Sequence, residues 1–100
     1  MATLRYTLGE YGNAMQTTVS TNVQHSAEHT TSGTASFIED ASTDIEARTG
    51  QVFVARCDGA VWLAFGGGTA AVGADHYLPA DETRVFHVGQ PGKISVIDDS

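Results

Sequence analysis

Residues 51–65 read Gln-Val-Phe-Val-Ala-Arg-Cys-Asp-Gly-Ala-Val-Trp-Leu-Ala-Phe, and this stretch decides the predicted fold. It holds two apolar runs rich in β-branched and aromatic residues, a composition that favours strands. Asp58-Gly59 separates the runs. Asp-Gly between two alternating runs is a strong hairpin signal, because both central residues of a type I′ turn need positive φ. We therefore predict two adjacent antiparallel strands, Gln51–Cys57 and Ala60–Phe65.

Strand signals recur on both sides of this pair at the short, regular spacing that is typical of a β-sandwich or barrel. Pro79 and Pro91-Gly92 mark turns between them. After residue 35, no stretch combines a 3.6-residue apolar stripe with the caps of a helix. The further strands that we predict are Ala35–Glu39, Thr43–Ala47, His76–Leu78, Arg84–Val88 and Lys93–Ile97.

The strand pattern predicts an all-β fold, an antiparallel β-sandwich of jelly-roll type that occupies residues 35–100. A chain of 100 residues has room for one domain. Alternation along the strands predicts which side chains fill the core. The expected inward side chains are Val52, Val54, Val61, Leu63, Phe65, Val85, Ile94 and Val96.

Residues 1–34 have a different composition, because Thr and Ser dominate and large apolar residues are sparse. Apolar and polar residues alternate in 4–8 and in 17–24, which predicts strands. Their side chains are only weakly apolar, so we predict an extended N-terminal attachment arm over residues 1–34 that is buried only against a partner. A short helical turn over Leu8–Met15 is an alternative that two glycines oppose.

The expected interface residues lie in this arm and on one strand of the domain. Trp62 alternates with Val61 and Leu63, so it faces outward if those two fill the core. An outward tryptophan usually marks an interface, and a ligand platform is the alternative. The interface residues that we predict are Leu4, Tyr6, Leu8, Tyr11, Val19, Val23 and Trp62.

The charge balance argues against two classes of partner. Twelve Asp and Glu against five Lys and Arg give a formal net charge of −7. Nucleic acids and anionic membranes bind through Lys and Arg, so we expect neither as a partner. The N-terminus lacks the basic and apolar regions of a secretory signal, and no apolar run is long enough to span a membrane. We expect a soluble protein made in the cytoplasm.

Several motifs suggest chemistry but lack its context. His25-Ser26-Ala27-Glu28-His29 matches the H-x-x-E-H pattern of inverted zinc peptidases, which requires a helix with both histidines on one face. The surrounding Thr, Ser and Asn residues do not predict such a helix. We therefore predict a solvated polar segment here.

Other candidate sites are equally incomplete. Gly66-Gly67-Gly68-Thr69 lacks the Lys-Ser or Lys-Thr pair of a phosphate loop, so a bent connection between strands is predicted. No serine lies in a G-x-S-x-G turn, and the single Cys57 is predicted to be a buried, inert thiol that forms no intrachain disulfide. Four candidate metal ligands lack the paired H-x-H signature of a cupin, and they are Asp58, Asp75, His76 and His87. We predict no catalytic, cofactor or metal site and no enzyme activity.

The segment from Ala35 to Asp98 resembles small accessory virion proteins of tailed bacteriophages and of the related gene transfer agents of α-proteobacteria. The resemblance rests on short motifs in a fixed order after a Ser/Thr-rich arm that ends in His-Thr-Thr-Ser-Gly-Thr-Ala. In this family the Gly-rich span joins two sandwich strands, and Leu-Pro-Ala opens the penultimate strand. The motifs are Ile38-Glu39-Asp40-Ala41-Ser42, Gly50-Gln51-Val52, Val61-Trp62-Leu63-Ala64-Phe65-Gly66, Thr69-Ala70-Ala71-Val72-Gly73, Tyr77-Leu78-Pro79-Ala80 and Pro91-Gly92-Lys93-Ile94-Ser95-Val96-Ile97.

The resemblance implies a structural protein of a bacteriophage virion: a capsid decoration or cement protein, or a head spike or fibre-base subunit. The outer surface of the head is its expected location, and the major capsid protein or a fibre protein is its expected partner. We also expect self-association as a homotrimer, because trimers match the local threefold positions of an icosahedral head. The alternatives are a tail accessory protein and a carbohydrate-binding β-sandwich module that uses Trp62, Tyr77 and Phe86.

Overall fold

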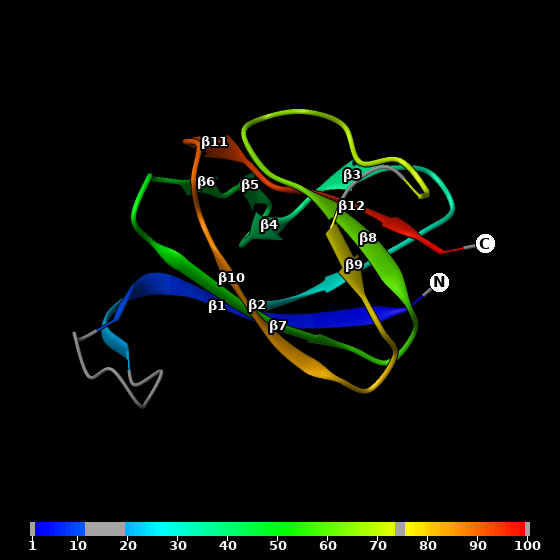
Figure 1. The fold of residues 1–100 in the computed structure, drawn as a ribbon, viewed down its shortest axis with the longest axis horizontal. Helices are drawn as coiled ribbons and strands as arrows, with labels where there is room; N and C mark the ends of the chain where they lie inside the picture. Colours follow the sequence, from blue (N-terminus) through cyan, green and yellow to red (C-terminus); the bar gives the residue numbers. More distant parts are fainter. Residues whose placement is uncertain (1, 12–19, 74–75, 100) are drawn as a thin grey trace.

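The computed structural model describes residues 2–11, 20–73 and 76–99. In these residues the protein is all-β with antiparallel sheets and no helix (Figure 1). The first sheet has the strand order β10 (Thr83–His87), β7 (Val52–Cys57), β1 (Thr3–Tyr11) and β2 (Ser20–Thr30). The second sheet has the order β3 (Ser36–Phe37), β12 (Ser95–Asp98), β8 (Val61–Ala64) and β9 (His76–Leu78).

Two short ribbons complete the described structure, one formed by β4 (Glu39–Asp40) with β5 (Thr43–Asp44), the other by β6 (Glu46–Ala47) with β11 (Gly92–Lys93). Strand positions agree with the sequence analysis to within a few residues, and His76–Leu78 agrees at both ends. Three predicted strands are each split into two pieces, and they are Ala35–Glu39, Thr43–Ala47 and Lys93–Ile97. Leu8–Tyr11, predicted as the start of a helical turn, is strand, and the rest of that segment lies outside the described residues.

One apolar core joins the two sheets, an arrangement compatible with a β-sandwich. Phe53 of β7 is fully buried at its centre, with its ring 5.5 Å from that of Tyr6 and 5.8 Å from that of Phe65. Side chains from both sheets and from the loops surround it. The buried residues of this cluster are Leu4, Tyr6, Leu8, Ile38, Ile45, Ala47, Phe53, Ala55, Cys57, Val61, Leu63, Leu78, Val88, Ile94 and Val96.

The N-terminal strand is an inner strand of the first sheet. β1 pairs with β7 on one side, with Leu4 opposite Cys57 and Leu8 opposite Phe53, and with β2 on the other side. The prediction of an attachment arm outside a 35–100 domain is therefore wrong for the described residues. β1 needs few large apolar residues, because it lies between β7 and β2. In this position its side chains Leu4, Tyr6 and Leu8 are buried in the core.

The predicted hairpin at Asp58-Gly59 is also wrong. β7 belongs to the first sheet and β8 to the second, so the connection crosses between sheets. Asp58 is held by the N-terminal strand instead: its Oδ1 accepts from the Thr3 N–H at 2.8 Å, and its own N–H donates to the Thr3 carbonyl at 3.3 Å. Gly59 is not among the glycines with positive φ, so the turn lacks the backbone geometry of type I′.

The side chains of β7 that point into the core are not the ones that were predicted. Phe53, Ala55 and Cys57 point into the core, while Val54 lies half-buried on the outer face. Arg56 shares the outer face with Val54, and this avoids burying its charge. Val85 of β10 is also outward and 38% exposed, and Phe65 is half-buried. The other predicted inward residues are confirmed as buried, and they are Val52, Val61, Leu63, Ile94 and Val96.

Thr31 joins the two ends of the chain, which lie side by side in Figure 1. This side chain is fully buried, and its hydroxyl accepts a hydrogen bond from the Ala2 N–H at 3.0 Å and donates one to the Asp98 carboxylate. The backbone repeats the connection, since the Thr31 N–H donates to the Ala2 carbonyl at 2.7 Å. The first strand and the last strand are thereby held at one point.

We expect Thr31→Val to lower the free energy of unfolding by about 1–3 kcal/mol, because it keeps the side-chain shape but removes the acceptor of the half-buried Ala2 N–H and the hydroxyl donor to Asp98. Urea denaturation followed by tryptophan fluorescence measures the change. Thr30→Val is the matched control on an exposed neighbouring position and should change stability by less than about 0.5 kcal/mol. Equal losses in both variants would contradict the role of Thr31.

Candidate functional site

Trp62 lies in an aromatic row on the outer face of the second sheet. In the strand register Trp62 is opposite Tyr77 of β9 and Ile97 of β12, so the three side chains share one face. The Trp62 and Tyr77 rings lie 4.8 Å apart between centroids, and the Trp62 Nε1–H donates to the Asp99 carboxylate at 3.0 Å. Tyr77 is 37% exposed. We call Trp62, Tyr77 and Ile97 the aromatic face.

The strands β8 and β9 bring no charged side chain to the aromatic face, and the Asp99 carboxylate at this face accepts the Trp62 Nε1–H. Neither β8 nor β9 contains Asp, Glu, Lys or Arg. The adjoining loop packs over the same sheet, where the Ala70 N–H donates to the Ser95 hydroxyl at 3.0 Å and both residues are buried. The same loop carries Val72, which is 51% exposed. Partly exposed aromatic surface of this kind, with few charged side chains, suits a protein interface.

The structure does not bring together the three rings of the predicted carbohydrate platform. Phe86 contacts Phe65 and His76, with centroid distances of 5.7 and 6.0 Å. This cluster lies between the edge strands β9 and β10, away from the Trp62–Tyr77 pair in the strand register. A platform made of Trp62, Tyr77 and Phe86 is therefore absent from the described residues.

The other predicted interface residues divide into two groups. Leu4, Tyr6 and Leu8 are at most 3% exposed, so the prediction that they meet a partner is wrong. The Tyr6 hydroxyl instead donates to the Glu39 carbonyl at 2.8 Å, and burial, together with the charge of Asp40, raises the pKa of Tyr6 to about 12. Val19 and the side chains of Tyr11 and Val23 lie outside the described residues.

The H-x-x-E-H segment forms part of β2, not a helix. Burial alternates along this strand, so His25 and His29 face inward while Glu28 faces outward. Four residues of strand separate the two histidines by about 13 Å, which is too far for both to bind one zinc ion. This geometry does not provide the site of a zinc peptidase.

The two histidines connect β2 to the second layer, which corrects the prediction of a solvated segment. His25 Nδ1 lies 2.9 Å from the Asp40 carboxylate of β4, and His29 Nε2 lies 3.0 Å from the Ser36 hydroxyl of β3. We call these two contacts the histidine clasp. Burial lowers the pKa of His29, although the nearby carboxylates of Glu39 and Asp44 raise it in part.

The remaining candidate motifs are the Gly-rich loop, Cys57 and the four candidate metal ligands. Gly66 and Gly67 both have φ of +86° and no helix follows them, as the predicted bent connection requires. Cys57 is fully buried, and burial raises the pKa of its thiol. Asp75 lies outside the described residues, and among the described ones no three His, Cys, Asp or Glu side chains are grouped to hold a metal ion.

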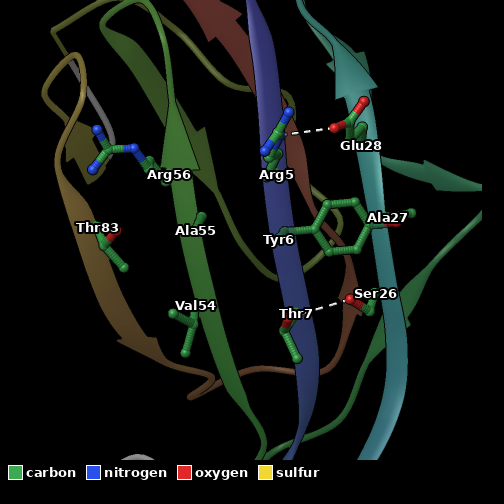
Figure 2. A pocket seen from close by; sticks show the side chains of 10 residues that line it. All are labelled: Arg5, Tyr6, Thr7, Ser26, Ala27, Glu28, Val54, Ala55, Arg56 and Thr83. Carbon is green, nitrogen blue, oxygen red and sulfur yellow. Dashed lines mark hydrogen bonds and ion pairs between the residues drawn. The ribbon is translucent and has the colours of Figure 1, made fainter.

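A hollow of about 380 Å³ on the outer face of the first sheet was not predicted from the sequence (Figure 2). One of its walls is formed by residues that are cross-strand partners on β10, β7, β1 and β2, and they are Thr83, Arg56, Arg5 and Glu28. The other wall contains Val54, Thr7 and Ser26. Sequence reasoning missed this site, because nothing local in either arginine's neighbourhood shows that β1 pairs with β7.

Comparisons with known proteins gave no match to a family model, to a curated protein or to a solved structure. The described part of the chain has no helix that is long and apolar enough to cross a membrane.

The lowered pKa of His29 predicts acid sensitivity. The unfolded chain takes up the His29 proton first, so the free energy of unfolding should fall as the pH falls below about 6.5. Denaturant unfolding at pH 7.5 and pH 5.5 should show a smaller loss for His29→Gln, which retains a polar group near Ser36. His87→Gln at an exposed position is the control and should follow the wild type. If all three proteins lost the same stability, His29 would not be responsible.

Proposed function

We propose that the protein is a non-enzymatic structural component of a bacteriophage virion, a capsid decoration or cement protein or a head spike or fibre-base subunit. The observation that carries this proposal is the aromatic face: a partly exposed row of Trp62, Tyr77 and Ile97, on a chain of net charge −7, to which β8 and β9 bring no charged side chain. Such a face suits docking against another protein. The virion assignment itself comes from the resemblance of residues 35–98 to accessory virion proteins.

The proposed partners are further copies of this chain, as a homotrimer, and the major capsid protein or a fibre protein. Copies with a charge of −7 repel one another, but screening at 0.15 M salt limits this repulsion to about 8 Å. Contact through the aromatic face brings no Asp or Glu of β8 or β9 against another copy. A closed trimer would let each copy cover part of this face.

The strand order supports the proposed jelly-roll topology. Such a fold needs eight strands in two four-stranded sheets, with connections that pass repeatedly from one sheet to the other. The orders β10-β7-β1-β2 and β3-β12-β8-β9 have this form, since β7 and β8, and then β9 and β10, follow each other in sequence but lie in different sheets. In this jelly roll, β1 takes the place beside β2 that would otherwise belong to the last strand.

The proposed location is the outer surface of the virion head, with a tail accessory role as the alternative. Acidic side chains would keep neighbouring particles apart and would not attract the packaged genome. A gold-labelled antibody against the purified protein should bind intact virions on the head. Labelling confined to the tail would support the accessory role, and virions without the protein would contradict the proposal.

We expect the purified wild-type protein to form trimers at tens of micromolar, and Trp62→Ala to shift it to monomer, because the substitution removes the largest ring of the aromatic face. Light scattering and native mass spectrometry measure the mass. Val85→Ser is the matched control, since Val85 is 38% exposed on the first sheet and should leave the trimer intact. A monomeric wild type would overturn self-association through this face.

A further inference from the structure

Strand β10 lies at the edge of the first sheet, and one side of its backbone faces away from β7. In an antiparallel pair, the backbone groups of successive residues point alternately toward the neighbouring strand and away from it. Just after β10, the Val88 N–H donates to the Gln51 carbonyl at 2.9 Å, so Val88 points toward the β7 side. By alternation, Thr83, Val85 and His87 direct their N–H and carbonyl groups outward. We call these three residues the free edge of β10.

Nothing in the described part of the chain covers this free edge. Among the described residues, no hydrogen bond from outside the sheet reaches Thr83, Val85 or His87. All three side chains are exposed. Phe86 makes its aromatic contacts from the inner face of the strand, so these contacts leave the backbone edge open. An open edge of this kind can pair with a strand of another chain.

The other three edge strands of the four-stranded sheets are protected from such pairing. β2 has register shifts against β1, and its two histidines hold it to β3 and β4. β3 has only two residues, and β9 has three and is followed by Pro79. Bulges, short strands and proline are common ways to block an edge. β10 has none of these over its five residues, and its register with β7 is regular.

We propose that the free edge of β10 pairs with the same edge of a second copy of this chain, antiparallel, about a twofold axis at Val85. This is the register that opposes all five residues of both strands. Val85 then faces Val85 of the second copy, Thr83 faces His87, and Arg84 faces Phe86. Residues of the free edge that face each other exchange two hydrogen bonds between N–H and carbonyl groups.

The side chains of β10 suit a second copy in this register. β10 contains no Asp or Glu, although the chain has a net charge of −7. Its one charged residue, Arg84, forms an ion pair within each copy, 3.0 Å from the Glu82 carboxylate. Opposite Phe86, Arg84 meets no like charge, and a guanidinium is attracted to an aromatic ring. Val85 is 38% exposed in the single copy and gains an apolar neighbour at the twofold axis.

This pairing is weaker than the trimer and separate from it. Two five-residue edges bury a small area, as in weak and transient complexes, so we expect pairing at about millimolar concentration. At tens of micromolar the trimer through the aromatic face stays the main species. The free edge belongs to the first sheet and the aromatic face to the second, so one copy can use both. Where trimers are held close together, β10 would link one trimer to the next.

The test is disulfide trapping at about millimolar protein under mild oxidation, measured by mass spectrometry and on a non-reducing gel. Val85→Cys should form a disulfide dimer, because the Cα atoms of a hydrogen-bonded pair lie about 5.5 Å apart, within disulfide range. Thr83→Cys is the matched control on the same strand face. Its two copies lie four residues apart along the pair, about 13 Å, and should link at least about tenfold more slowly. Cys57 is fully buried and does not interfere.

A mixture of Thr83→Cys with His87→Cys tests the register, because these two residues face each other across the twofold axis. We expect the mixed dimer to form at a rate close to that of Val85→Cys. Failure of the mixture alone would overturn the antiparallel register. Equal rates for Val85→Cys and Thr83→Cys would show random collision and overturn the pairing.

A second substitution separates this proposal from the trimer. Trp62→Ala in the Val85→Cys protein removes the largest ring of the aromatic face and should leave disulfide formation unchanged. Loss of the disulfide in this double variant would overturn the free edge as a separate contact. A Val85→Cys disulfide in a protein that never forms trimers would support the free edge and contradict only the trimer.

Discussion

The pairing of β1 with β7 is the contact on which the rest of the structure depends. With Leu4 opposite Cys57 and Leu8 opposite Phe53, the inner faces of both strands supply the centre of the core. The same register places Arg5 opposite Arg56 on the outer face. A slip of one residue would turn each apolar side chain outward and each arginine inward. The core and the hollow on the outer face therefore have one common origin.

The two outer sheet faces differ in chemistry. The second sheet presents Trp62, Tyr77 and Ile97 without charges from β8 or β9, which suits contact with another protein. The first sheet presents arginines, their acidic partners and hydroxyls around a hollow. A subunit docked through the aromatic face would leave this outer face of the first sheet open.

The two sides of the molecule are closed by different interactions. Between β9 and β10 the contact is aromatic, through Phe65, His76 and Phe86. Between β2 and the β3–β4 segment it is the histidine clasp. Burial lowers the pKa of His29, so acid weakens the fold on the β2 side.

The sequence by itself determined where the strands lie and that no helix forms in the described residues, because period-two alternation and turn residues act over a few neighbouring positions. The orientation of β7 was also available from sequence, since Arg56 shares a face with Val54 and excludes that face from the core. Only the tertiary structure decided which strands pair. Asp58-Gly59 has the local sequence of a hairpin turn, and this sequence is the same whether its two strands pair or belong to different sheets. The pattern of Leu4, Tyr6 and Leu8 is that of an extended arm as long as the pairing of β1 with β7 and β2 is unknown. The Arg5–Arg56 hollow follows from that long-range pairing, to which residues about fifty positions apart in the chain contribute equally, and so no local pattern could reveal it.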